Sequence, residues 1–319
     1  MSADPTAPAG GDEPRRSPPE EPKSLFEKLG AALPVGLTAI ATAFAGLSTS
    51  EMTQAMYWRS AAAQDQAKAN DQWTLAGFKR DRSLIVQTAA AQLRATAGYR
   101  PPPVTGQTSE SAPDAVRQAA QWLAGNGPPK AELPPVADPA IQAVLDAVRD
   151  RRPEAEVVRM ARAIDRGRLD QAIHSAEEEM ARVEREWDPV LRQVERIVAV
   201  GASGAGKVGE EATRSRAAAE ASALQAARYE VESRRYRAEA TLNQGLGFLY
   251  EVRVKASTAE SDRHRDRSKN FFYAMLAAQV GATVASLGLA RQRKSAFWTL
   301  AGIAGIVAVA FGVYVYVVM

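Results

Sequence analysis

Two long apolar runs near the C-terminus constrain the fold of this chain more than any other feature. Residues 271–290 are twenty residues without a charged side chain, and residues 295–319 are twenty-five more. A helix rises about 1.5 Å per residue and a bilayer core is about 30 Å thick, so each run is long enough to cross a membrane. Only the polar, basic stretch 291–294 separates the two runs. The sequence therefore predicts two transmembrane helices joined by a tight turn.

A third uncharged run, residues 29–50, is richer in alanine and contains Pro34. We interpret it as an uncleaved first membrane span. A cleaved signal peptide is one alternative, because residues 43–45 have the A-x-A form of a cleavage site, and an interfacial or buried helix is another. The 28 residues before the run are long for a signal peptide. Since no charged residue lies inside any of the three runs, we expect no ion or proton pathway.

Proline divides the rest of the chain into linkers and long helices. Fifteen of the 18 prolines lie in residues 1–28 and 101–139, and the stretches between are rich in alanine and charged residues, which favour helix. We predict an all-α integral membrane protein with three transmembrane helices, long extramembrane helices and a coiled-coil segment. The predicted segments are a disordered tail (1–28), the first span (29–50), a long helix (51–98), a linker with one short helix (99–139), a coiled-coil helical insertion (140–209), a returning helix (210–270) and the last two spans (271–290 and 295–319).

Apolar residues spaced alternately three and four apart predict a heptad seam in the insertion. The seam residues are Ile173, Met180, Val183, Trp187, Val194 and Ile197. We expect one longer helix from Glu154 onward, with a kink at Pro189. The returning helix carries a less regular heptad series of apolar residues. The glycine-rich residues 201–209 are predicted to form the loop of an antiparallel helix pair.

Residues 201–207 also match six positions of a phosphate-binding loop, but two requirements of such a loop are missing. Val208 stands where a Ser or Thr would hold magnesium, and no strand pattern surrounds the loop. There are no cysteines, and the two histidines, His174 and His264, are too few for a histidine metal site. We therefore expect no cofactor, no metal and no enzymatic activity. The 40 basic and 37 acidic residues are mixed along the chain, so no nucleic-acid partner is expected.

The predicted long helix carries the signature Ala-Asn-Asp-Gln-Trp at residues 69–73, followed by Phe78, Lys79 and Arg82. With an apolar span before it and two spans joined by a basic turn at the end, the chain resembles the bacterial membrane-protein family called domain of unknown function 4337. The resemblance covers roughly residues 25–97 and 225–319, and it implies three spans but no established activity.

Physically, the signature residues Asp71, Gln72, Trp73 and Phe78 are expected to dock the long helix onto the returning helix. In this interpretation Trp73 and Phe78 pack across the contact, and Asp71 and Gln72 donate or accept hydrogen bonds across it. A ligand site at the same residues is the alternative.

These observations favour a membrane-anchored, non-enzymatic structural or interaction protein. Its expected partners are the lipid bilayer and, through the helical region, a second copy or an envelope protein. The alternative is an accessory or regulatory subunit of a cell-envelope transport or enzyme complex. The tail and the turn at 291–294 carry seven Lys and Arg residues. Eight Lys and Arg residues lie near the spans on the other side, but they border a 220-residue region, and long regions translocate largely regardless of charge. The expected location is thus the inner membrane, with the helical region extracytoplasmic.

Overall fold

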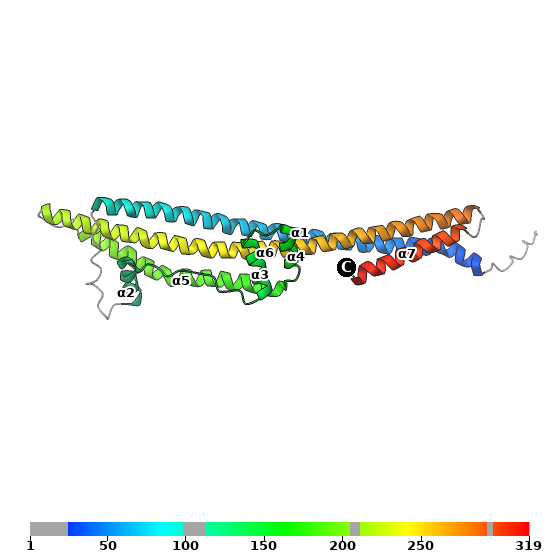
Figure 1. Ribbon diagram of the computed structural model, residues 1–319, viewed down its shortest axis with the longest axis horizontal. Helices are drawn as coiled ribbons and strands as arrows, with labels where there is room; N and C mark the ends of the chain where they lie inside the picture. Colours follow the sequence, from blue (N-terminus) through cyan, green and yellow to red (C-terminus); the bar gives the residue numbers. More distant parts are fainter. Residues whose placement is uncertain (1–24, 98–112, 205–210, 292–295, 319) are drawn as a thin grey trace, which may run out of the picture. The chain divides into compact units, whose positions relative to one another are not determined.

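A computed structural model describes residues 25–97, 113–204, 211–291 and 296–318. Within these ranges the chain contains helices and no strand, which confirms the predicted all-α fold. The elements are α1 (Leu25–Ala97), α2 (Asp114–Gln121), the π-helical turn η1 (Trp122–Asn126), α3 (Pro139–Arg149), α4 (Glu154–Ala161), α5 (Arg166–Gly204), α6 (Glu211–Arg291) and α7 (Ala296–Val318) (Figure 1). Three of them, α1, α6 and α7, are long and apolar enough to cross a membrane, as expected of a multi-pass membrane protein.

The first two predicted spans are parts of much longer helices. α1 has 73 residues and α6 has 81, and both continue without a break beyond their apolar runs. Pro34 lies inside α1, where the Thr38 hydroxyl donates a hydrogen bond to the Pro34 carbonyl. No other proline occurs in either helix, so nothing in the local sequence stops them.

The chain divides into two compact units, which we describe separately. Unit 1 contains residues 1–52 and 265–319, and unit 2 contains residues 53–264. The predicted tail up to residue 24, the first part of the predicted linker up to residue 112, residues 205–209 of the predicted loop and the turn at 292–294 lie outside the described residues.

In unit 1, large side chains of α1 fill spaces left by small residues of α6 and α7. Leu37 is buried. A Cβ added to Gly281 would lie 3.3 Å from one methyl carbon of Leu37, and a Cβ added to Gly305 would lie 2.7 Å from the other. Phe44 occupies the corresponding space at Gly312 and stacks on Phe271, with ring centroids 6.2 Å apart. Small residues therefore let these helices approach closely, as is common for helices packed in lipid.

In unit 2, α6 lies between α1 and α5 (Figure 1). Residues 53–97 of α1 pack against α6 on one side, and the apolar stripe of α5 packs against α6 on the other. The Asp138 side chain accepts a hydrogen bond from the Ala140 N–H and caps α3, which begins with Pro139 as the sequence indicates. α2 and η1 cover the α5–α6 contact through Trp122, whose ring meets Trp187 edge-on at 6.2 Å.

Two predicted boundaries are wrong. The helix expected from Glu154 ends at Ala161, and α5 begins only at Arg166, after Asp165 has accepted a hydrogen bond from the Arg168 N–H. Residues 201–204 were expected in a loop but continue α5. Gly201 is tolerated there because its missing side chain makes room for Leu224 of α6. α5 also continues as one helix through Pro189.

Candidate functional site

The contact between α1 and α6 in unit 2 is built from small residues that repeat every seven positions. On α1 each of them is at most 8% exposed. They are Ala55, Ala62, Ala69, Ala76, Ser83 and Ala90. Small buried residues of α6 follow the same period at Ala226, Ser233, Ala240, Gly247 and Ser261, and Val254 interrupts the series. We call this contact the small-residue seam.

Serine hydroxyls hold the small-residue seam together at two places. The Ser83 and Ser233 hydroxyl oxygens are 3.0 Å apart, and the Ser261 hydroxyl donates to the Ala55 carbonyl at 2.9 Å. A buried hydroxyl without a partner costs free energy, so these bonds fix which residues of the two helices can face one another.

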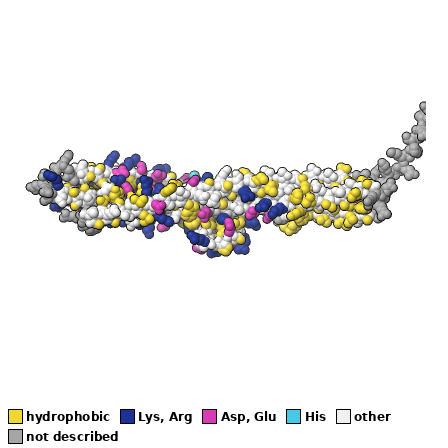
Figure 2. All heavy atoms as spheres, turned by 90° about the horizontal axis from the view of Figure 1, so that it is seen from above, with side chains coloured by type: hydrophobic (Ala, Val, Ile, Leu, Met, Phe, Trp, Pro, Cys, Tyr) yellow, Lys and Arg dark blue, Asp and Glu magenta, His cyan; other side chains and the backbone are white. Residues whose placement is uncertain are grey.

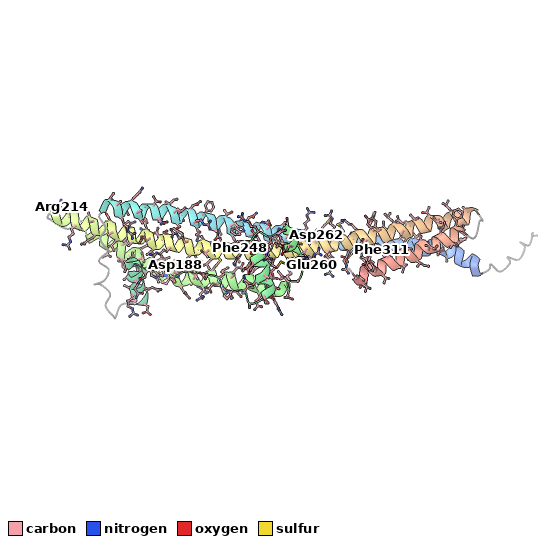
Figure 3. All side chains as sticks on the ribbon, in the orientation of Figure 1. Asp188, Arg214, Phe248, Glu260, Asp262 and Phe311 are labelled. Atoms are coloured by element: carbon pink, nitrogen blue, oxygen red, sulfur yellow. The ribbon has the colours of Figure 1, made fainter. Side chains whose placement is uncertain are left out.

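Trp73 lies beside the seam and against α6. Its Nε1–H donates to Glu251 Oε1 at 2.8 Å, and its ring meets Phe248 edge-on with centroids 4.8 Å apart (Phe248 is labelled in Figure 3). A Cβ on Gly247 would lie 3.2 Å from Trp73 Cε2, so glycine at this position makes room for the indole. Gln72 borders the same place, and its Oε1 is buried without a hydrogen-bond partner among the described residues.

Phe78 and Asp71 do not take part in this contact, so their predicted docking role is wrong. Phe78 is 67% exposed and Asp71 is exposed as well. The reason is helical geometry: five residues after Trp73, Phe78 is turned by about 140° around α1. The docking interpretation therefore applies to Trp73 and not to the whole signature.

A network of charged and polar side chains joins α1, α5 and α6 near Trp73. Asp65 on α1 is 3% exposed, and its Oδ2 lies 3.0 Å from Arg253 Nε on α6. The same guanidinium reaches Asp170 Oδ1 on α5 at 3.2 Å. A buried carboxylate is costly unless it is paired, so Arg253 is the residue that permits Asp65 at the contact.

Tyr250 makes a second link between α6 and α5. Its hydroxyl donates to Glu177 Oε1 at 2.7 Å, and Lys68 Nζ lies 5.6 Å from the centre of its ring. Burial, and then the bond to Glu177, raise the pKa of Tyr250 to about 12. The hydroxyl therefore stays protonated and acts as a donor at neutral pH.

The residues of the predicted heptad seam lie between α5 and α6. Ile173, Val183, Trp187 and Val194 are buried, while Met180 and Ile197 are partly buried against the same clusters. The neighbouring α6 residues in the Trp187 cluster include Leu224, Val231, Ala238 and Leu242.

A half-open groove of about 790 Å³ lies in unit 2 where the extended residues 132–138 pass over α3, α5 and α6. Its floor includes Ile141, Leu145 and Leu249, and Leu133 packs into the space at Gly245. At its rim Arg168 Nη1 donates to Asp138 Oδ2 at 3.0 Å, and this bond lowers the pKa of Asp138 below its usual value. The Arg168 guanidinium at the rim is thus already paired with Asp138.

The residues that suggested chemistry in the sequence are not assembled into a reaction centre within the described ranges. His174 is an exposed residue whose Nε2 lies 3.1 Å from Glu178 on the same helix. The described residues hold no group of three or more His, Cys, Asp or Glu side chains placed for a metal ion. Of the phosphate-loop-like segment, Gly201 to Gly204 are helical, and Lys207 and Val208 lie outside the described residues.

Sequence reasoning missed Asp65, Phe248, Tyr250, Glu251 and Arg253, although a signal was present. The seven-residue repeat of Ala and Ser along residues 55–90 marks the buried stripe of α1. Asp65 lies three residues after Ala62, and Trp73 lies four residues after Ala69. Both side chains therefore lie beside the contact. Their partners on α6 depend on how the two helices are aligned, which the repeat alone does not specify.

Comparisons with known proteins add no further assignment. No protein-family model, no curated protein and no solved structure matches the chain. The family resemblance therefore stays a prediction, and the contacts described above have to be interpreted on physical grounds.

Proposed function

We propose that this chain is a membrane-anchored, non-enzymatic structural or interaction protein whose helices present a surface outside the bilayer. The observation that carries the proposal is the continuity of α1. Its membrane-length apolar run continues in the same helix through residues 53–97, a further length of about 68 Å at 1.5 Å per residue.

The chemistry of unit 2 supports a structural role. Two of its polar contacts join helices, the Asp65–Arg253 ion pair and the Tyr250–Glu177 hydrogen bond. Such pairs hold helices in one alignment, and the described residues include no group of three or more His, Cys, Asp or Glu placed for a metal ion. The polar network thus serves to fix the helix arrangement that carries the outer surface.

The groove beside residues 132–138 favours a second candidate, an accessory or regulatory subunit of a cell-envelope transport or enzyme complex. An apolar floor of this size would accept a segment of a partner. In both cases the proposed location is the inner membrane.

Purification of the full chain from membranes in mild detergent, followed by mass spectrometry, separates the two candidates. Recovery of the chain alone or with itself supports the structural role. A stoichiometric foreign envelope complex supports the accessory role. Recovery in the soluble fraction, without detergent, would contradict both candidates.

The proposed orientation places unit 2 outside the cytoplasm. The chain has no cysteine, so single cysteines report orientation directly. We expect an impermeant maleimide to label exposed Glu178→Cys in intact cells and Ser17→Cys only after lysis. The reverse pattern would place unit 2 in the cytoplasm.

A further inference from the structure

The side of α1 that faces away from α6 in unit 2 is long and exposed, with the cations Lys68 and Arg82 along one edge. Three series lie on this side, each made of every seventh residue. They run from Met56 to Ala91, from Tyr57 to Gln92 and from Ser60 to Ala95. All 18 positions are exposed, and only Asp71 and Asp81 are charged. We call these positions the outer face of α1. Its large apolar side chains are between 55% and 68% exposed, and they are Met56, Tyr57, Phe78, Leu84 and Ile85.

The exposed side of α5 in the same unit is different. There Arg182 bonds to Glu179 and to Glu186, and Arg192 lies 3.3 Å from Asp188. A helix surface rich in charge pairs is what water stabilises. The five exposed large apolar residues of the outer face of α1 instead form two groups, at 56–57 and at 78–85, and grouped exposed apolar side chains mark contacts with other proteins.

We propose that the outer face of α1 pairs with the same face of a second copy, with the two helices parallel and in register. This rests on the proposed function, a membrane-anchored interaction protein, and names its partner. The face offers almost no charge by which a charged partner could be selected. Eight of its thirteen remaining residues are Ala, Ser, Thr or Gly, small like the Ala and Ser by which α1 packs against α6.

Membrane anchoring makes the parallel direction the natural one. Residues 53–97 follow directly on the first span, so copies inserted with the same orientation leave the bilayer on the same side and in the same direction. Confinement to one membrane also raises the effective concentration of one α1 for another. A twofold axis along the pair would place identical residues opposite each other.

The available area is sufficient for such a pair. A buried aromatic side chain contributes about 150–250 Å², so the exposed part of Phe78 or Tyr57 amounts to about 100 Å². Five large side chains on each of two copies then supply about 1,000 Å², and the small residues between them add to this. Specific interfaces begin near about 1,200 Å². Asp71 and Asp81 are the two charged side chains on this face, and in an in-register pair each would lie near its own copy, which opposes the pairing.

Disulfide trapping in native membranes tests this pairing, because the chain contains no cysteine. In an in-register pair, Thr74→Cys and, separately, Thr88→Cys on the outer face should each form a disulfide with the same residue of the second copy. We expect at least fivefold more disulfide-linked dimer than for the matched control Glu178→Cys on the exposed side of α5. Equal trapping at all three positions, or none at Thr74→Cys and Thr88→Cys, would overturn the inference.

A second variant separates loss of pairing from loss of folding. Phe78→Asp with Ile85→Asp, added to Thr74→Cys, should abolish trapping while helical circular dichroism is unchanged, because both side chains are exposed. Undiminished trapping in this variant would also overturn the inference. If Thr74→Cys is instead captured by a foreign protein, the pairing is wrong while the interaction role survives. If the chain does not fractionate with membranes, the proposed function itself fails.

Discussion

The two units both contain closely packed helices, but the surroundings of these helices differ. In both, small residues allow helices to approach closely. In unit 1, Gly281, Gly305 and Gly312 receive the large side chains Leu37 and Phe44 of α1. In unit 2, small residues of α1 face small residues of α6, and charged groups such as Asp65 and Arg253 lie beside them.

The difference follows from what surrounds each contact. Unit 1 exposes apolar side chains such as Val280 and Ile306, and its surface in Figure 2 is mainly apolar and uncharged, whereas charged side chains are seen over unit 2. In lipid, burying an apolar side chain brings little hydrophobic gain, so fit between surfaces decides stability. In water, apolar burial provides the stabilisation, and polar pairs fix the alignment of the helices.

The largest effect is expected for a charge placed in the water-exposed unit. Val183→Asp puts a carboxylate into the α5–α6 contact, where Val183 is 8% exposed, and should destabilise unit 2 by several kcal/mol. Limited proteolysis should then cleave residues 166–204 faster, while extraction of the chain with membranes is unchanged. Glu184→Asp, at the exposed neighbouring position, is the control. Equal protease resistance of Val183→Asp and the parent chain would show that the contact is not maintained.

A smaller effect is expected for added volume in unit 1. Gly305→Leu forces a side chain into the space of Leu37 and should cost about 1–3 kcal/mol in the free energy of unfolding in detergent. Gly302→Leu, on the same helix, is a matched control because nothing lies within 4 Å of its Cβ position. If the two variants unfold alike, fit at the glycines does not stabilise unit 1.

A hydrogen-bond deletion probes the polar contacts of unit 2. Trp73→Phe keeps an aromatic ring beside Phe248 but removes the donor to Glu251, and it should cost about 1 kcal/mol in chemical unfolding. Glu251→Leu removes the acceptor, and the double variant with Trp73→Phe should lose little more than either single variant. Additive losses would mean that the indole and the carboxylate do not interact.

The smallest effect concerns alkaline pH. The pKa of Tyr250 is raised to about 12 in the folded chain, above the ordinary value of 10.0. Its protonated form therefore contributes stability in full below pH 10, and this contribution is lost as the pH rises from 10 toward 12. Ultraviolet titration should show one of the eight tyrosines ionising near pH 12, and Tyr250→Phe should remove that step. A step that persists in Tyr250→Phe would assign it to another tyrosine.

The all-helical fold and the three membrane-length helices were predictable from sequence because they depend on local properties. Runs of uncharged residues at 271–290 and 295–319 exceed the length that a bilayer requires, and proline marks where helices cannot continue. The alternating spacing of Ile173, Val183 and Val194 likewise identifies one side of α5, because helical periodicity places them together.

The pairing of the helices was decided only by tertiary structure. Whether Trp73 meets Glu251, and whether Asp65 meets Arg253, depends on the relative alignment of two helices separated by more than a hundred residues. A shift of one residue would rotate each side chain by about 100° and exchange buried for exposed positions. Phe78 shows the same limit, since its apolar character suggested burial whereas its angular position on α1 leaves it exposed. Composition and periodicity therefore determine which helices form, and only the packed arrangement determines which side chains meet.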